Sequence, residues 1–412
     1  MGNPGKLAQA ARRTGLWAAC ALAATAFVVP AARAQDATAF QLNPGHTGSV
    51  AMPGFQPPLK LLWKKKIKGQ GLSYPLIANG IVYVTIAHHA FNDYEGVDLY
   101  AVDAATGKTK WKRYIDNQID FTADTWANAT YDDGQVFVLD RYLVMTSYDG
   151  MTGRTKWSQL EGAYDAPDGA SAPTAFDGTV YMQTAAASER KGLLRWGIGW
   201  GTPSTSPAIG DGGTYEAYPC SVFKYRLTDG VQLWQNGQNC GGGATTVQFL
   251  DNRLFIRDQG GQPNSILDSA TGATLGTFPD IGRRNVVPAV YDDNGSRFMI
   301  APSDNALVKY DVTNPASVTA VWSTSLNNEP MTSAPLVVNG YAIEGTTAGG
   351  LYVVSPQGQV AWSMNLGGSV APFNENGGPV PTTGLGAGGG IIVVPTENDN
   401  RDAQNLFAFA PQ

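Results

Sequence analysis

The sequence Thr106-Gly107-Lys108-Thr109-Lys110-Trp111 recurs as Thr152-Gly153-Arg154-Thr155-Lys156-Trp157 and, with more divergence, as Asp229-Gly230-Val231-Gln232-Leu233-Trp234. Each copy follows a short apolar run, and a Gly-containing turn between two β-prone runs predicts a hairpin. A second hairpin precedes the first copy, with the turn Asn79-Gly80 between two further apolar runs. Four strands per repeat is the content of one blade of a β-propeller.

Tryptophans mark the predicted outer strand of each blade, at Trp63, Trp111, Trp157, Trp234, Trp322 and Trp362. Most intervals between them are roughly 40 to 50 residues, the repeat length of a propeller blade. The longer interval from Trp157 to Trp234 contains a Gly-, Ser-, Thr- and Pro-rich stretch, which we interpret as an insertion around residues 185–219 rather than as a further blade. The interval from Trp234 to Trp322 holds one degenerate blade, in which Gly276 replaces the tryptophan.

The two ends of the chain are predicted to share one blade. The last repeat begins near Pro381 and has only three predicted strands, whereas 61–67 forms a lone strand with no hairpin before it. Pairing the two would remove two open sheet edges at once. We therefore predict an all-β fold, a seven-bladed β-propeller closed by both termini, with eight blades as the less favoured count. The propeller domain is expected to span residues 59–412, after an N-terminal extension at 35–58.

Residues 1–34 have the features of a signal peptide. A basic start is followed by an apolar stretch from Leu16 to Val29 and by the small-residue sequence Ala32-Arg33-Ala34. The pair Arg12-Arg13 leaves both general and twin-arginine export open. We expect a periplasmic or secreted protein without a membrane anchor.

Two cysteines, Cys220 and Cys240, remain after removal of the signal peptide. An even number of cysteines in an exported protein indicates a disulfide. Cys220 is predicted at the start of a third strand and Cys240 just after the fourth, and these two points are neighbours in an antiparallel pair. We therefore expect a disulfide at one edge of a single blade.

Composition restricts the class of partner. Charged residues make up 15% of the chain and the formal net charge is −6, against an average of about 25% charged residues. Nucleic acids and anionic membrane surfaces attract basic proteins, so neither is expected as a partner. The oligomeric state cannot be read from the sequence.

The repeated pattern Leu-Tyr-x-Val-Asp-x-x-Thr-Gly-Lys-x-x-Trp resembles the pyrroloquinoline-quinone-like (PQQ-like) repeat of a β-propeller superfamily. The opening Asn43-Pro44-Gly45-His46-Thr47-Gly48, followed by 57–64, is similar to the start of exported single-domain members of that superfamily. The resemblance covers nearly all of the mature chain. It implies the fold far more strongly than any activity, because one fold hosts many functions.

Two branches of the superfamily give different expectations. In quinoprotein dehydrogenases an eight-bladed propeller holds the quinone between a tryptophan and a disulfide of adjacent cysteines, beside a calcium or lanthanide ion. This sequence has no adjacent cysteine pair, so the resemblance leaves PQQ as a cofactor that is not favoured. The other branch consists of non-enzymatic propellers, among them the envelope lipoprotein that supports outer-membrane protein assembly, whose lipid anchor is not expected here.

Candidate site residues are expected on the face that carries the longer loops, because tight turns occupy the other face. His88 and His89 form the only histidine pair and are candidates for metal binding or acid–base chemistry. Glu397, Asp399 and Asp402 alternate with amide and basic residues in a short loop, a pattern that can bind calcium.

Several arginines are predicted near loops of the same face, and converging guanidinium groups bind carboxylates or sulfates on a ligand. Two tryptophans outside the predicted repeat positions could cover the mouth of the central channel. These candidate ligand-binding residues are Arg141, Arg195, Trp196, Trp200, Arg257, Arg283 and Arg284.

The sequence therefore favours an exported PQQ-like propeller of the cell envelope that binds a protein partner, or a small or saccharide ligand, through its loop-rich face. The alternative is an enzyme on the same scaffold. It would be a quinone-dependent oxidoreductase, or a lyase or hydrolase that acts on an acidic saccharide through His88 or His89 and the arginines.

Overall fold

The structure, a computed structural model, describes residues 34–88, 96–116, 126–160, 171–183, 185–197, 205–217, 221–237, 246–257, 263–281, 286–303, 305–373, 380–398 and 403–412. The chain divides into two compact units, Met1–Ala32 and Arg33–Gln412. All described residues belong to the second unit. The predicted signal peptide lies outside them, apart from its last residue.

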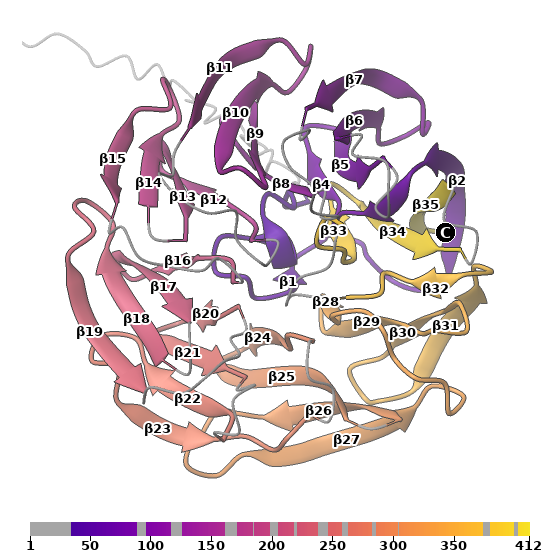
Figure 1. Cartoon of the computed structure of the whole chain (residues 1–412). Coiled ribbons are helices and arrows are strands. Elements are labelled where there is room, and N and C mark those ends of the chain that lie inside the picture. Colours follow the sequence, from indigo (N-terminus) through magenta and orange to yellow (C-terminus); the bar gives the residue numbers. More distant parts are fainter. Residues whose placement is uncertain are drawn as a thin grey trace, which may run out of the picture. The chain divides into compact units, whose positions relative to one another are not determined.

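The second unit is a β-propeller of eight blades, each built on four or more antiparallel strands (Figure 1). Blade 1 contains β3 (Gln70–Leu72), β4 (Leu76–Ala78), β5 (Ile81–Ala87), β6 (Val97–Asp103) and β7 (Thr109–Ile115). Blade 2 contains β8 (Ala127–Asp132), β9 (Gln135–Asp140), β10 (Val144–Asp149) and β11 (Thr155–Leu160). Blade 3 contains β12 (Thr174–Phe176), β13 (Thr179–Met182), β14 (Ala185–Ser188) and β15 (Leu194–Gly197).

The next three blades repeat the same four-stranded order. Blade 4 contains β16 (Ala208–Gly210), β17 (Gly213–Ala217), β18 (Ser221–Arg226) and β19 (Gln232–Gly237). Blade 5 contains β20 (Gln248–Leu250), β21 (Arg253–Ile256), β22 (Ser265–Asp268) and β23 (Thr274–Thr277). Blade 6 contains β24 (Ala289–Asp293), β25 (Ser296–Ser303), β26 (Ala306–Asp311) and β27 (Thr319–Ser325).

The last two blades also take strands from the N-terminal part of the chain. Blade 7 contains β28 (Leu336–Val338), β29 (Tyr341–Gly345), β30 (Gly350–Val354) and β31 (Val360–Asn365), and β1 (Ser49–Val50) pairs in parallel with β28. Blade 8 contains β32 (Ser369–Val370), β33 (Gly386–Gly388), β34 (Ile391–Glu397), β35 (Ala403–Pro411) and, from the other end of the chain, β2 (Leu59–Lys68).

The prediction of seven blades was wrong. The segment around 185–219 that we interpreted as an insertion contains strands β14 to β17, and blade 3 fills the long interval between Trp157 and Trp234. Its outer strand carries Trp196, which lies four residues after Gly192, the same spacing as Trp111 after Gly107. Blade 3 escaped detection because its strands have only three or four residues and β14 is mostly alanine, which has low strand propensity.

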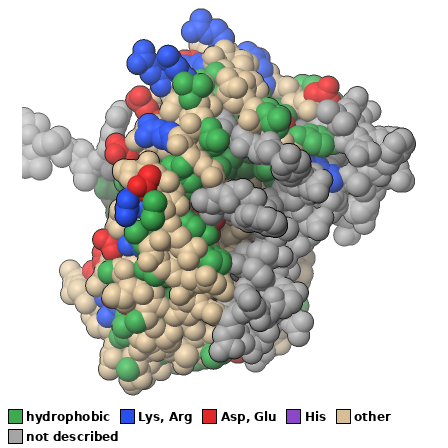
Figure 2. Space-filling model, turned by 60° about the vertical axis from the view of Figure 1, so that its left-hand side comes forward, with side chains coloured by type: hydrophobic (Ala, Val, Ile, Leu, Met, Phe, Trp, Pro, Cys, Tyr) green, Lys and Arg blue, Asp and Glu red, His purple; other side chains and the backbone are tan. Residues whose placement is uncertain are grey.

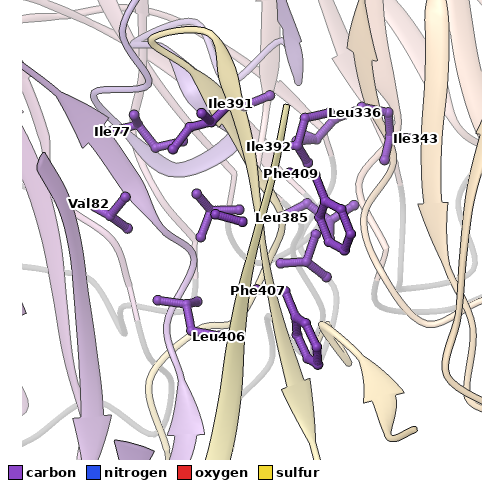
Figure 3. Close-up of a cluster of buried hydrophobic side chains, with 14 of the residues drawn as sticks. Ile77, Val82, Leu336, Ile343, Leu385, Ile391, Ile392, Leu406, Phe407 and Phe409 are labelled. Atoms are coloured by element: carbon purple, nitrogen blue, oxygen red, sulfur yellow. The ribbon is translucent and has the colours of Figure 1, made fainter. Parts of the chain in front are cut away.

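The closing strand expected at 61–67 is present as β2, which pairs antiparallel with β35 over nearly its whole length. Side chains of β35 alternate across the sheet, so Leu406 and Phe407 point to opposite faces (Figure 3). The core on one side includes Ile77 and Val82 of blade 1, and that on the other includes Leu336 and Ile343 of blade 7. Blade 8 thus joins the first and last repeats through a continuous apolar core.

Tight turns define one face of the propeller. The turn between the first and second strands usually has two residues with positive φ, as at Asn79 (49°) and Gly80 (73°). Such type I′ turns need Asn, Asp or Gly, which accept the left-handed conformation. The connections from second to third strand, and from fourth strand to the next blade, leave from the opposite face. We call these the tight-turn face and the loop-rich face.

A recurring contact joins neighbouring blades. The outer-strand tryptophan of one blade donates its indole N–H to a backbone carbonyl in the last turn of the next, over 2.7 to 3.1 Å. The pairs are Trp63–Ala104, Trp111–Gly150, Trp157–Glu189, Trp196–Leu227, Trp234–Ser269 and Trp322–Pro356. These tryptophans therefore fix the angle between blades, which is the packing role expected from their periodicity.

The N-terminal extension lies in the centre of the ring, where it is drawn in indigo (Figure 1). It contains the 3-10 helix η1 (Phe40–Leu42) and contacts the innermost part of every blade. Carbonyl groups of the extension accept backbone N–H groups from seven blades, and the side chain of His46 reaches Thr174 of blade 3. The seven donors are Ile77, Tyr131, Ile209, Phe249, Val290, Val337 and Gly389.

Candidate functional site

The loop-rich end of the propeller axis is filled by aromatic side chains. Phe40, from the N-terminal extension, stacks on Phe373 with 5.6 Å between ring centroids and an interplanar angle of 12°. Tyr74 meets the edge of Phe40 at 5.3 Å. All three are buried and pack with Val286 and Val287, which precede the first strand of blade 6. The axis is therefore closed by an apolar plug at the level where the innermost strands begin.

Buried polar side chains at the loop-rich end form hydrogen bonds both within and between blades. The Asn128 amide donates to the Ser171 carbonyl at 3.2 Å, and its oxygen accepts the Thr382 N–H at 3.1 Å. The carboxylate of Glu344 is fully buried and accepts hydrogen bonds from the Ser333 hydroxyl and the Gly345 N–H. The Asn128 bonds therefore join blade 2 to residues before blade 3 and in blade 8, whereas the Glu344 bonds stay within blade 7.

His88 lies at the end of β5 on the loop-rich face and contacts a buried carboxylate. Asp98, in β6, is 1% exposed and pairs with both His88 and Lys112. The His88 ring lies 5.8 Å from the ring of Tyr114, on the outer strand β7. The cluster is thus in the outer half of blade 1, and His89 falls outside the described residues.

The structure separates the candidate arginines. Arg141 follows β9 and Arg257 follows β21, so both are on the loop-rich face, where both are buried. Arg257 donates to the carbonyl of Val286 at 2.9 Å, beside the axial plug. Arg195 instead donates to the carbonyl of Gly178, a turn residue of the tight-turn face. The remaining candidates, Arg283 and Arg284, lie outside the described residues.

Trp196 occupies the outer strand of blade 3, where it makes the contact common to the other blades. It is 8% exposed, and its indole N–H donates to the carbonyl of Leu227 at 2.9 Å. This placement gives Trp196 a packing role between blades 3 and 4. Trp200 lies outside the described residues.

The acidic and cysteine candidates are only partly described. Glu397 ends β34 on the loop-rich face and pairs in register with Ser369, whereas Asp399 and Asp402 lie outside the described residues, as do Cys220 and Cys240. Within the described ranges, no group of three or more His, Cys, Asp or Glu side chains is arranged to hold a metal ion. The calcium site and the disulfide therefore stay predictions.

Two sets of residues escaped the sequence reasoning. The axial plug was missed because Phe40 belongs to a segment without periodicity. A second set surrounds Glu189 on the tight-turn face, within the segment that we had interpreted as an insertion. The sequence could have revealed Glu189 because a charged residue there departs from the repeat. The equivalent turn position in five other blades holds an uncharged residue: Ala104, Gly150, Leu227, Ser269 or Pro356.

On the side shown in Figure 2, the described hydrophobic side chains are scattered rather than gathered in one patch. Hydrophobic side chains, in green, alternate with charged ones on the side shown in Figure 2. Among the described residues, the large exposed side chains include Leu160 (66%) at the loop-rich end of blade 2 and Met151 (59%) at its tight-turn end. None of the helices in the described part of the chain has the length and apolar character needed to cross a membrane.

The sequence of residues 60–217 matches the family model described as outer membrane protein assembly factor BamB. Over these residues the chain is similar to the PQQ-like β-propeller family. The match runs from β2 through β17, so it includes blade 3 and the segment that we had interpreted as an insertion. No curated protein sequence matches the chain.

Solved structures support the β-propeller fold. BamB from Moraxella catarrhalis is 11% identical, with a TM-score of 0.57 over 85% of this chain and 99% of that chain. A europium-containing methanol dehydrogenase is 14% identical, with a TM-score of 0.62 over 91% and 98%. The quinohemoprotein alcohol dehydrogenase from Comamonas testosteroni is 14% identical, with a TM-score of 0.66 over 92% and 81%. At these identities the likeness shows the fold alone, and it is shared with both branches.

Proposed function

We propose that this PQQ-like propeller is an exported scaffold of the cell envelope that binds a protein partner through its loop-rich face. The observation that carries the proposal is the aromatic plug. Among the described residues, Phe40 and Phe373 stack on each other at the loop-rich end of the axis, which favours a surface that meets a partner there. The match of 60–217 to the BamB family model favours the same reading.

The described residues do not fit a bound quinone and its cation. A quinone needs a flat slot with a platform on each side and a hard cation beside its oxygens. Phe40 and Phe373 stack directly on each other at the axis, and the sequence has no adjacent cysteine pair. The number of blades no longer distinguishes this protein from the quinoprotein dehydrogenases, because it has eight blades rather than the predicted seven.

The His88–Asp98 pair favours a second candidate, an enzyme that acts on an acidic saccharide. A buried carboxylate orients an imidazole for proton transfer, and His88 is partly exposed on the loop-rich face. Lys112 would then bind the acidic group of the substrate. This candidate is weaker because Lys112 already pairs with Asp98.

Matched substitutions in blade 2 test the scaffold. Leu160 and Met151 are similarly exposed at opposite ends of that blade. After chemical crosslinking in cells of the native host, Leu160→Glu should remove a specific crosslinked partner band that Met151→Glu retains, because a buried charge at an interface is costly. Equal loss in both variants, or no specific band with the wild type, would reject the loop-rich face as the binding surface.

The enzymatic alternatives have separate readouts. Dye reduction with an alcohol or sugar after reconstitution with quinone and calcium would establish the oxidoreductase. Cleavage of an acidic polysaccharide by the wild type, abolished by His88→Gln, would establish the saccharide enzyme. The scaffold predicts neither activity.

A further inference from the structure

The turn that contains Glu189 differs from its equivalents in the other blades. Its backbone makes the usual contacts: the N–H donates to the Gly178 carbonyl at 3.2 Å, and the carbonyl accepts the indole N–H of Trp157 at 2.7 Å. The equivalent backbone in blade 1, at Ala104, donates to Gly80 at 3.0 Å and accepts from Trp63 at 2.8 Å. Glu189 therefore adds a carboxylate at a position fixed by the joint between blades 2 and 3.

The Glu189 side chain is buried without full hydrogen bonding. It is 4% exposed, and its Oε1 atom has no hydrogen-bond partner. Leaving a buried acceptor unpaired costs about 1–3 kcal/mol. Asp132 and Asp133, in the turn between β8 and β9, lie beside Glu189 and disfavour its ionised form. Although the Glu189 carboxyl group shares a hydrogen bond with Asp132 and feels the charge of Arg195, its Oε1 atom is left without a donor.

A groove on the tight-turn face opens onto this carboxylate. Its inner part has a volume of about 550 Å³ and runs beside Thr38 of the N-terminal extension. The charged residues that line it are all acidic: Asp132, Asp133, Asp177 and Glu189. A contiguous outer part of about 770 Å³ shares Asp133 and Glu189 and is lined by Arg154, Lys156 and Arg190. The negative charge is therefore concentrated toward the axis and the positive charge toward the rim.

We propose that the inner groove binds an organic cation, the guanidinium or ammonium group of an arginine or lysine side chain of a protein partner. Glu189 Oε1 supplies an unpaired acceptor, and the neighbouring aspartates supply further oxygens. A planar guanidinium pairs with two carboxylate oxygens at once, and its several N–H donors suit a groove with many acceptors. A metal ion is a poorer fit, because these carboxylates do not converge as ligands in the described residues.

Binding of such a cation is linked to a proton. Burial, followed by the charges of Asp132 and Asp133, raises the pKa of Glu189 to about 8. The charge of Arg195 lowers the pKa of Glu189. The other nearby basic residues, Arg154, Lys156 and Arg190, line the outer part of the groove. A bound cation favours the ionised carboxylate, so binding below pH 8 releases a proton and the affinity rises as the pH increases toward 8.

Titration calorimetry of the mature protein with N-acetyl-argininamide tests the site, with the neutral N-acetyl-citrullinamide as the control ligand. We expect one site per chain, at least tenfold tighter binding at pH 8.5 than at pH 6.5, and proton release measured in two buffers of different ionisation enthalpy. Glu189→Gln should weaken binding at least tenfold and abolish the proton release. Asp133→Asn is a second variant that should also weaken binding.

The matched control is Asp229→Asn, which removes an exposed carboxylate from the corresponding turn of blade 4 and should change the affinity less than twofold. Equal binding of the citrulline ligand, unchanged binding in folded Glu189→Gln, or equal loss in Asp229→Asn would each overturn the proposal. Because the groove is on the tight-turn face, its failure leaves the proposed function of the loop-rich face untouched.

Discussion

The indole ring of Trp196 lies against Gly230, in the last turn of the neighbouring blade. A Cβ atom on Gly230 would come within 2.5 Å of Trp196 Cε3, and the residue has a φ of 69°. The same relationship joins Trp111 to Gly153 and Trp234 to Gly272. A glycine is required at each of these turns by its backbone conformation and by the ring that covers it.

Replacing Gly230 should therefore destabilise the protein more than replacing a glycine with the same backbone conformation in open space. Gly230→Ala combines left-handed strain with overpacking against Trp196, and we expect a loss of about 3 kcal/mol. Gly212, in the same blade, has a φ of 68° and no atom within 4 Å of its Cβ position. Gly212→Ala should lose only about 1 kcal/mol. Urea unfolding of both variants measures the difference, and equal losses would contradict the close packing of Trp196.

His46 should make the stability of the protein depend on pH. It is fully buried, and burial lowers its pKa to about 3. Thr174 Oγ1 donates to the Pro207 carbonyl, so it accepts from Nε2–H of His46 and the unpaired Nδ1 is the unprotonated nitrogen. Because His46 binds a proton below about pH 6.5 in the unfolded chain but not in the folded chain, its contribution to the free energy of unfolding should fall by about 1.4 kcal/mol per pH unit below 6.5.

The matched measurement is urea unfolding of the wild type and of His46→Gln between pH 7.5 and 4.5. The difference in free energy of unfolding between the two proteins should be constant above about pH 6.5. Below pH 6.5 the wild type should lose stability relative to His46→Gln. Burial raises the pKa of Asp140 to about 6, and burial together with the neighbouring aspartates raises that of Glu189 to about 8. Both groups act in the opposite direction, but they contribute equally to both proteins. Parallel profiles over the whole range would exclude a buried neutral His46.

The Cys220–Cys240 disulfide stays a prediction with new support from its neighbours. Ser221 and Gly237, the described residues nearest to the two cysteines, are partners across β18 and β19. A loop of about twenty residues closed by a disulfide implies roughly 3 kcal/mol of stabilisation. Mass spectrometry of the non-reduced exported protein should find the linked peptides, whereas two alkylatable thiols would disprove the bond.

Much of the propeller could be predicted because its repeats are periodic. The Asn-Gly and Asp-Gly turns, the Thr-Gly turns and the outer tryptophans report local structure, and the lone strand around Trp63 could be matched to the three-stranded last repeat. Blade 3 could not be recognised by strand propensity, since β14 reads Ala-Ala-Ala-Ser. The spacing from Gly192 to Trp196 was the signal that would have revealed it.

The site was less predictable because its residues derive their roles from contacts between distant segments. Phe40 becomes part of the axial plug only through contact with Phe373, more than three hundred residues away. Arg141 and Arg257 share a face, as expected, but the side chain of Arg195 turns to the other one. Such placements depend on the whole ring and leave no local pattern in the sequence.

The position of the N-terminal extension has a consequence for the order of folding. Residues 35–48 are synthesised before every blade, yet their hydrogen-bond partners extend to Gly389 in the last repeat. These contacts have very long sequence separation, and the entropy of closing such loops must be lost before the contacts can form. The first residues of the propeller are therefore among the last to reach their final environment. Blades that form earlier keep their innermost strands without these hydrogen bonds until the chain is complete.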